Sequence, residues 1–81
     1  MHKITTTQRS TGRQLDYMAE NLRERHNTTV SIQRFTSAYK SGRSETMFWF
    51  NVEGVSVAIK DTWEEAQAYY RELMKIKPKE D

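Results

Sequence analysis

The chain contains no cysteine among its 81 residues. Secreted domains of this size usually depend on disulfide bonds, because a short chain buries only a small hydrophobic core. The sequence also lacks any apolar run close to the roughly 20 residues that a membrane-spanning helix needs. Its first residues include no apolar stretch of the signal-peptide type. These absences predict a single cytoplasmic domain that is not embedded in a membrane.

Motifs for catalysis and metal binding are lacking as well. The two histidines, His2 and His26, have no cysteine or carboxylate at the spacing of metal ligands. There is no glycine-rich phosphate loop and no nucleophile motif. The carboxylate pair Glu64-Glu65 is explained by the first turn of a predicted helix, where negative charge is favourable. We therefore expect a protein that is not an enzyme and that holds no metal and no cofactor.

Positive charge is concentrated in the first half of the chain. Residues 1–45 contain eight Lys or Arg and four Asp or Glu, whereas residues 46–81 contain five and seven. The two halves therefore carry formal charges of +4 and −2. This asymmetry favours a basic surface built by the N-terminal half, and scattered solvent-exposed arginines are the alternative.

The first helix is predicted over residues 12–26. Three apolar residues recur there at the spacing of one helical face: Leu15, Met18 and Leu22. Thr11 and Gln14 have the spacing of a capping box at its start, and Asn27 is a suitable stop. Residues 1–10, which precede it, are polar and rich in threonine. We expect them to form a flexible arm, made basic by Lys3 and Arg9.

The second helix is predicted to begin at Asp61-Thr62. Asp61 with Glu64, and Thr62 with Glu65, both have the spacing of a capping box. Pro78 ends this helix, and residues 78–81 are expected to form a disordered tail. Four residues share its apolar face: Trp63, Ala66, Tyr70 and Leu73.

Between the helices, β-branched and aromatic residues predict three strands, at residues 28–39, 47–52 and 55–60. Turns at 41–44 and 53–54 connect them, so the strands form an antiparallel meander. The prediction is an α+β fold in which residues 11–77 make one two-layer domain of order α-β-β-β-α, with the sheet packed on the second helix.

Alternation along the strands predicts which side chains face the second helix. Eight are assigned to this core: Val30, Ile32, Phe48, Phe50, Val52, Val55, Val57 and Ile59. Arg34 has core parity, so we expect a bulge or an edge position near it. The other face would carry Phe35, Tyr39, Met47 and Trp49.

This second face is the candidate binding site. Exposed rings stack on bases and cations at the rim hold phosphates, which is a known solution for binding nucleic acid. The predicted nucleic-acid-binding residues are Arg34, Tyr39, Lys40, Arg43 and Trp49. Two alternatives stay open at this stage. The first helix could cover the face, or the face could bind a protein partner, including a second copy of the chain.

The junction Asp61-Thr62-Trp63-Glu64-Glu65-Ala66, with Tyr70 beyond it, resembles the strand-to-helix junction of AP2-type domains. These include the arm-type DNA-binding domains of phage and transposon integrases. The resemblance covers about residues 30–76. It implies that three strands precede the helix and that the sheet face enters the DNA major groove. By location it implies a DNA-facing role for the outward strand positions near Arg34, Lys40, Arg43 and Trp49.

The α-β-β-β-α order is also that of double-stranded-RNA-binding domains, whose second helix begins with a lysine cluster that grips phosphates. Glu64 and Glu65 stand at those positions here and would repel phosphate, which favours DNA over double-stranded RNA. The leading hypothesis is a small accessory protein, of the kind that phage or mobile elements encode, that binds nucleic acid through its aromatic and basic sheet face. The alternative is a protein–protein adaptor or inhibitor that uses the same face.

Overall fold

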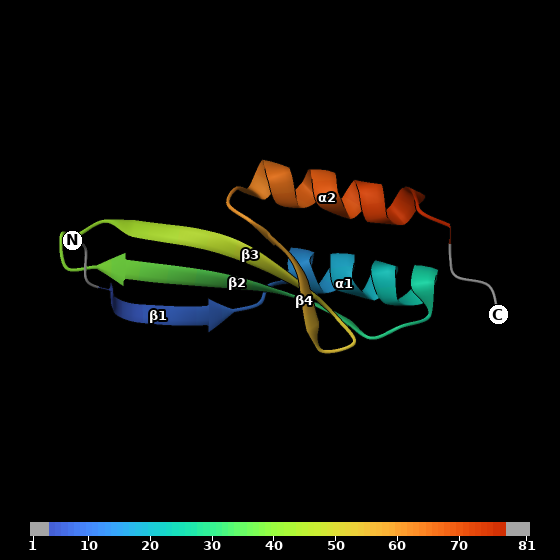
Figure 1. Ribbon diagram of the computed structural model, residues 1–81, viewed down its shortest axis with the longest axis horizontal. Helices are drawn as coiled ribbons and strands as arrows, with labels where there is room; N and C mark the ends of the chain where they lie inside the picture. The colour runs from blue at the N-terminus through green and yellow to red at the C-terminus, as the bar shows by residue number, and fades with distance from the viewer. Residues whose placement is uncertain (1–3, 78–81) are drawn as a thin grey trace.

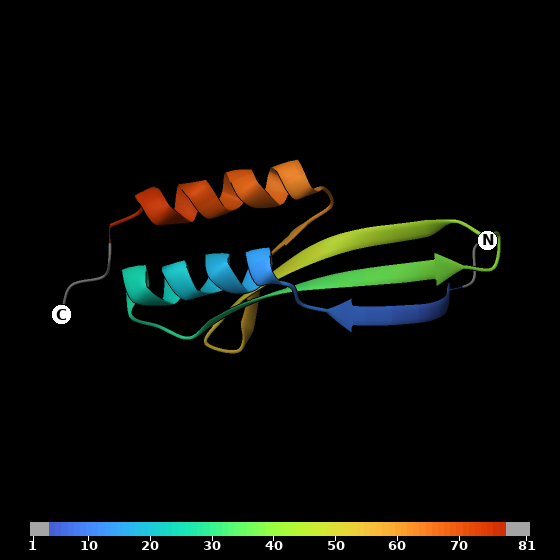
Figure 2. The ribbon, with the colours of Figure 1, turned by 180° about the vertical axis from the view of Figure 1, so that it is seen from behind.

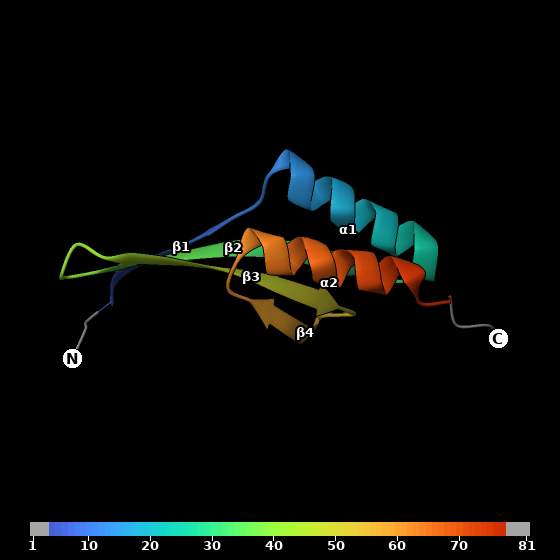
Figure 3. The ribbon, with the colours of Figure 1, turned by 90° about the horizontal axis from the view of Figure 1, so that it is seen from above.

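The computed structural model describes the backbone of residues 4–77 and the side chains of residues 9–77. Six elements follow one another: β1 (Ile4–Ser10), α1 (Arg13–His26), β2 (Val30–Tyr39), β3 (Ser44–Val52), β4 (Val55–Lys60) and α2 (Trp63–Lys75). The strands form one antiparallel sheet in the order β1-β2-β3-β4. Both helices lie side by side over the same face of this sheet (Figures 1, 2 and 3). The α+β class and the two-layer arrangement are therefore confirmed.

The sheet has four strands rather than the three predicted. Residues 4–10, expected to be a flexible arm, form strand β1 instead, and this strand pairs with the second half of β2. Threonine is β-branched and suits an extended backbone, so a threonine-rich segment can form a strand without apolar alternation. Lys3 and the predicted tail at 78–81 lie outside the described residues.

The ends of the helices follow the sequence only in part. Thr62 caps α2, because its hydroxyl oxygen accepts a 3.1 Å hydrogen bond from the backbone N–H of Glu65. The N-cap of α1 is Gly12, which offers no side-chain hydrogen bond, so the predicted capping box at Thr11 is wrong. Asn27 ends α1 in the left-handed conformation at φ 51°, as predicted from its role as a stop.

One hydrophobic core joins both helices to the sheet. Nine residues are buried in it: Leu15, Met18, Ala19, Leu22, Val30, Ile32, Phe48, Phe50 and Ala66. Trp63, Tyr69, Tyr70 and Leu73 of α2 are half-buried and pack against this cluster. The ring of Phe50 meets the ring of Tyr69 edge-on with centroids 4.9 Å apart. Helix α1 therefore contributes to the same core as α2 and leaves the opposite face of the sheet uncovered.

The predicted facing of β4 is wrong. Val57 and Ile59 were expected in the core, yet they are 47% and 46% exposed, and Val55 is also exposed. Ala58 lies opposite Phe50 and Lys60 lies opposite Phe48, so these two residues face the helices. On this side the Phe50 ring packs against Tyr69, and the ammonium group of Lys60 lies 4.8 Å from the centroid of the Tyr69 ring. An irregularity in the β3–β4 pairing between Phe50 and Asn51 accompanies this shift.

Of the two alternatives expected near Arg34, a bulge is absent from β2, but an edge position lies beside it: β1 pairs with β2 only from Arg34 to Tyr39, so residues 30–33 lie at the edge of the sheet. Strands β2 and β3 pair without interruption from Val30 opposite Val52 to Ala38 opposite Ser44. Arg34 keeps its place on the helix-facing side but is exposed to solvent. It lies beside the N-terminal end of α1, where it lines an open pocket together with Gly12 and Arg13.

Candidate nucleic-acid interface

The face of the sheet that points away from the helices, called here the outer face, carries adjoining apolar side chains. Residues directly opposite each other in an antiparallel pair share a face. Phe35 lies opposite Met47, and Trp49 lies opposite both Gln33 and Ile59. The rings of Phe35 and Trp49 are in contact, with centroids 4.8 Å apart and planes tilted by 44°. The structure thus brings together three of the four side chains that the sequence assigned to this face.

Trp49 sits on strand β3 in the interior of the sheet and is half-buried by its neighbours. Its indole Nε1 is buried and has no hydrogen-bond partner among the described residues. An unpaired buried N–H costs on the order of 1–3 kcal/mol. Tryptophan at this position is therefore not optimal for folding alone, and such departures from local optimality are typical of functional surfaces.

Strands β1, β2 and β3 continue past the helices as a projecting arm (Figures 1, 2 and 3). We define the arm as residues 4–10 and 34–47. The molecule measures 50 × 23 × 22 Å, and the arm makes up one end of its long axis. The arm contains four basic residues and one acidic residue, a formal charge of +3. The rest of residues 11–77 contains seven basic and eight acidic residues, a formal charge of −1.

Two arginines lie at the base of the arm, one on each face of the sheet. Arg9 lies opposite Phe35 and therefore points to the outer face. Arg34 lies opposite Ser10 and Phe48 and points to the helix side, where its Nε donates a 3.1 Å hydrogen bond to Ser10 Oγ. Arg34 and Trp49 are thus on opposite faces, so Arg34 is not part of the rim of the outer face as the sequence suggested.

The tip of the arm holds the other predicted site residues. Lys40 and Arg43 lie in the β2–β3 turn and both are exposed. Arg43 forms an exposed salt bridge with Glu45, with 3.6 Å between Nη2 and Oε1. The hydroxyl of Tyr39 donates a 2.9 Å hydrogen bond to Glu45 Oε2. This hydrogen bond is the main cause that raises the pKa of Tyr39 above its ordinary value.

The salt bridge at the tip does not cancel the charge of the arm. Exposed ion pairs contribute about 0–1 kcal/mol, so a stronger anionic ligand can displace Glu45 from Arg43. The tip is therefore a place where one guanidinium and one ammonium group can contact a ligand, with the Tyr39 ring beside them. Tyr39 is separated from the Phe35–Trp49 pair along the strand and belongs to the tip.

Sequence reasoning missed two residues of this surface, Arg9 and Ile59. Arg9 was assigned to a flexible segment, although a run of β-branched threonines before it is a signal for a strand. Val57 and Ile59 were assigned to the core and are exposed instead; Ile59 lies opposite Trp49 and extends the apolar part of the outer face.

Within residues 4–77, no three His, Asp or Glu side chains come together in a way that could hold a metal ion. Neither α1 nor α2 has the length and apolar character needed to cross a lipid bilayer.

Comparison with known proteins assigns no family. No protein-family model matches the chain, and no curated protein or solved structure is significantly similar to it. The resemblance of the β4–α2 junction to AP2-type domains therefore stays a prediction.

Proposed function

We propose that the protein is a small non-catalytic module that binds nucleic acid with the arm and the adjoining part of the outer face. The observation that carries this proposal is the separation of charge along the molecule, with +3 on the arm and −1 on the rest of residues 11–77. A basic projection attracts a polyanion and orients it before contact. Phosphate contacts supply most of the sequence-independent affinity for nucleic acid.

The distribution of the cations around the arm also supports binding to a polyanion. Arg9 and Arg34 project from opposite faces of the sheet at the base of the arm, and Lys40 and Arg43 lie at its tip. If the arm inserts into a groove of the nucleic acid, phosphates on either face of the sheet would therefore each contact a cation. The major groove of DNA is about 12 Å wide and admits a two-stranded β-ribbon, of which the β2–β3 hairpin is an example.

The aromatic pair supplies a second kind of contact. Base stacking on an aromatic side chain contributes roughly 1–3 kcal/mol per base and tolerates any sequence. Phe35 and Trp49 adjoin Arg9 on the outer face. DNA is the favoured ligand over double-stranded RNA, because Glu64 and Glu65 occupy the start of α2. These carboxylates would repel phosphates at that end of the helix.

A titration with short single-stranded and double-stranded oligonucleotides at two salt concentrations tests the proposal. We expect binding at low salt that weakens steeply as salt rises, because each phosphate contact releases counterions. Absence of binding at low salt would refute the proposal.

A protein partner at the outer face is the second candidate function. It is favoured by the exposure of Ile59 opposite Trp49, since this aliphatic side chain does not contribute to phosphate binding. Charged residues are depleted and aromatic and methionine residues enriched at the centres of protein interfaces. Binding through this apolar surface would change little with salt, so the same comparison of two salt concentrations separates the two candidates.

A further inference from the structure

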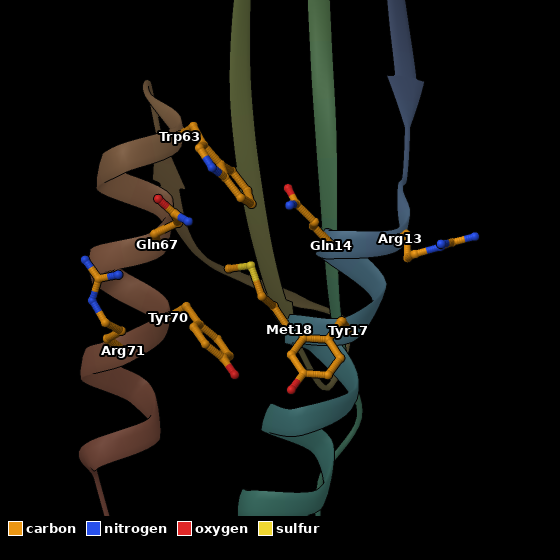
Figure 4. Close-up of a pocket in the computed structure, with 8 residues that line it drawn as sticks. All are labelled: Arg13, Gln14, Tyr17, Met18, Trp63, Gln67, Tyr70 and Arg71. Atoms are coloured by element: carbon orange, nitrogen blue, oxygen red, sulfur yellow. The ribbon is translucent and has the colours of Figure 1, made fainter.

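The two helices leave an open groove between them on the side of the molecule away from the sheet. The groove has a volume of about 530 Å³. A 3.0 Å hydrogen bond from Asn21 Nδ2 to Tyr70 Oη ties the helices together at one end of it. Toward the N-terminal ends of the helices, side chains from both line its walls (Figure 4).

The walls of the groove are mainly apolar. Met18 and Tyr17 come from α1, and Trp63 and Tyr70 come from α2. Trp63 and Tyr70 extend from α2 toward α1, and Met18 extends into the space between the helices (Figure 4). Tyr17 is 64% exposed, the largest exposure of any large apolar or aromatic side chain described. Volumes of about 300–1,000 Å³ with aromatic walls are typical of binding sites.

The charged residues at the groove have one sign. Arg13 of α1 and Arg71 of α2 lie at its edges, with their guanidinium groups directed away from the space between the helices (Figure 4), and no carboxylate lines it. Among residues 9–77, neither guanidinium takes part in a salt bridge. Arg13 is the first residue of α1, where a positive charge is unfavourable for the helix dipole. Its charge therefore does not serve the stability of the helix.

We propose that this groove binds an acidic amphipathic helical segment of a protein partner. Two parallel helices with apolar side chains between them form a channel into which a third helix can place its apolar residues. The two arginines are complementary to carboxylates that flank such a segment. Glutamines Gln14 and Gln67, one on each helix, supply hydrogen-bonding groups for its polar atoms. The site lies on the helical layer, so it stays accessible when the outer face is occupied.

A peptide rather than nucleic acid is the favoured occupant. The groove offers two cations beside four large apolar or aromatic side chains. Affinity for nucleic acid depends on many phosphate contacts, whereas a helix in a groove binds mainly through its buried apolar side chains. This inference is independent of the function proposed for the arm.

The test is a selection of displayed random peptides against the full chain, followed by nuclear magnetic resonance mapping. The enriched peptides are expected to combine aromatic or aliphatic residues at helical spacing with Asp or Glu. Binding of these peptides should shift the signals of Trp63 and of residues 13–18 and leave the signals of the arm residues unchanged. Failure to enrich any peptide, or enrichment of peptides that map to the outer face, would overturn the proposal.

Three variants show whether the groove itself is responsible. Tyr17→Ala should lower the affinity for the peptide without affecting the fold, because Tyr17 is largely exposed. The double variant Arg13→Gln/Arg71→Gln should lower the affinity for the peptide by roughly three- to tenfold and abolish the preference for Glu over Gln in the peptide. Arg25→Gln, on the last turn of α1, is the matched control and should bind normally. Unchanged binding by the double variant, or displacement of the peptide by a dT oligonucleotide that shifts Trp63, would contradict the assignment.

Discussion

Arg9 and Arg34 project from opposite faces of the sheet at neighbouring positions of the β1–β2 pair. Arg9 lies opposite Phe35, and Arg34 lies opposite Ser10, whose hydroxyl accepts its hydrogen bond at 3.1 Å. The base of the arm is therefore flanked by a cation on each side. This relationship depends on strand β1. Because β1 pairs with β2, two arginines that are far apart in the sequence form one surface that can contact a polyanion from two sides.

The packing of the core is tested by Phe50→Ala. Phe50 is fully buried and lies between the sheet and Tyr69. Its loss should lower the free energy of unfolding by about 3–5 kcal/mol, which approaches the whole stability of a small domain. The matched control is Ile59→Ala on the outer face, which should cost much less because Ile59 is 46% exposed. Chemical denaturation measures both, and equal losses would contradict the assigned faces of β3 and β4.

The caps of the two helices should respond differently to the loss of threonine. Thr62→Ala removes the hydrogen bond to the Glu65 N–H and should destabilise the protein by about 1 kcal/mol. Thr11→Ala should have little effect, because the N-cap of α1 is Gly12. Thermal unfolding of the two variants checks this contrast, and a larger loss for Thr11→Ala would show that the start of α1 is wrongly placed.

Tyr39 should titrate above its ordinary pKa of 10.0, because Glu45 accepts the hydrogen bond of its hydroxyl. A pKa that is higher in the folded state stabilises the fold below the unfolded pKa, and this contribution is lost as pH rises through the folded value. Ultraviolet difference titration of the protein against Tyr39→Phe isolates this group. Glu45→Gln should move the pKa of Tyr39 downward, and an unchanged pKa would contradict the hydrogen bond at the tip.

The role of the aromatic pair is tested by Trp49→Ala. If Trp49 stacks on a base, the variant should bind an oligonucleotide more weakly by roughly 1–3 kcal/mol. It should stay folded, because Trp49 lies outside the buried core. Circular dichroism checks the fold, and a fluorescence-anisotropy titration with a labelled oligonucleotide measures the affinity. Loss of folding in this variant would assign the ring to structure, whereas unchanged affinity would remove it from the interface.

Local patterns predicted both helices and the three strands from β2 to β4, because each has a clear hydrophobic period. They failed for β1, a mainly polar strand with three threonines among its seven residues that is paired with β2. They also failed for the facing of β4. The alternation of Val57 and Ile59 suggested burial, but the irregularity in the β3–β4 pairing between Phe50 and Asn51 puts Ala58 opposite Phe50 and Ile59 opposite Trp49.

The candidate site was predictable only in part for a related reason. Register within a hairpin follows from sequence, so Phe35, Met47 and Trp49 were placed together. The position of Arg9 beside them depends on pairing between β1 and β2, which are separated along the chain by α1. The groove depends on how α1 and α2 lie side by side, and no local pattern encodes that arrangement.

The slope of the logarithm of the binding constant against the logarithm of salt concentration tests the central claim most directly. The protein, the double variant Arg9→Ala/Arg34→Ala and the charge-matched control Arg23→Ala/Arg25→Ala on α1 should be compared on one DNA duplex. Each lost phosphate contact should reduce the slope by about 0.9, so the arm variant should lose up to about 1.8 while the control keeps the slope of the unchanged protein. Equal slopes for both double variants would show that the arm does not hold the phosphates.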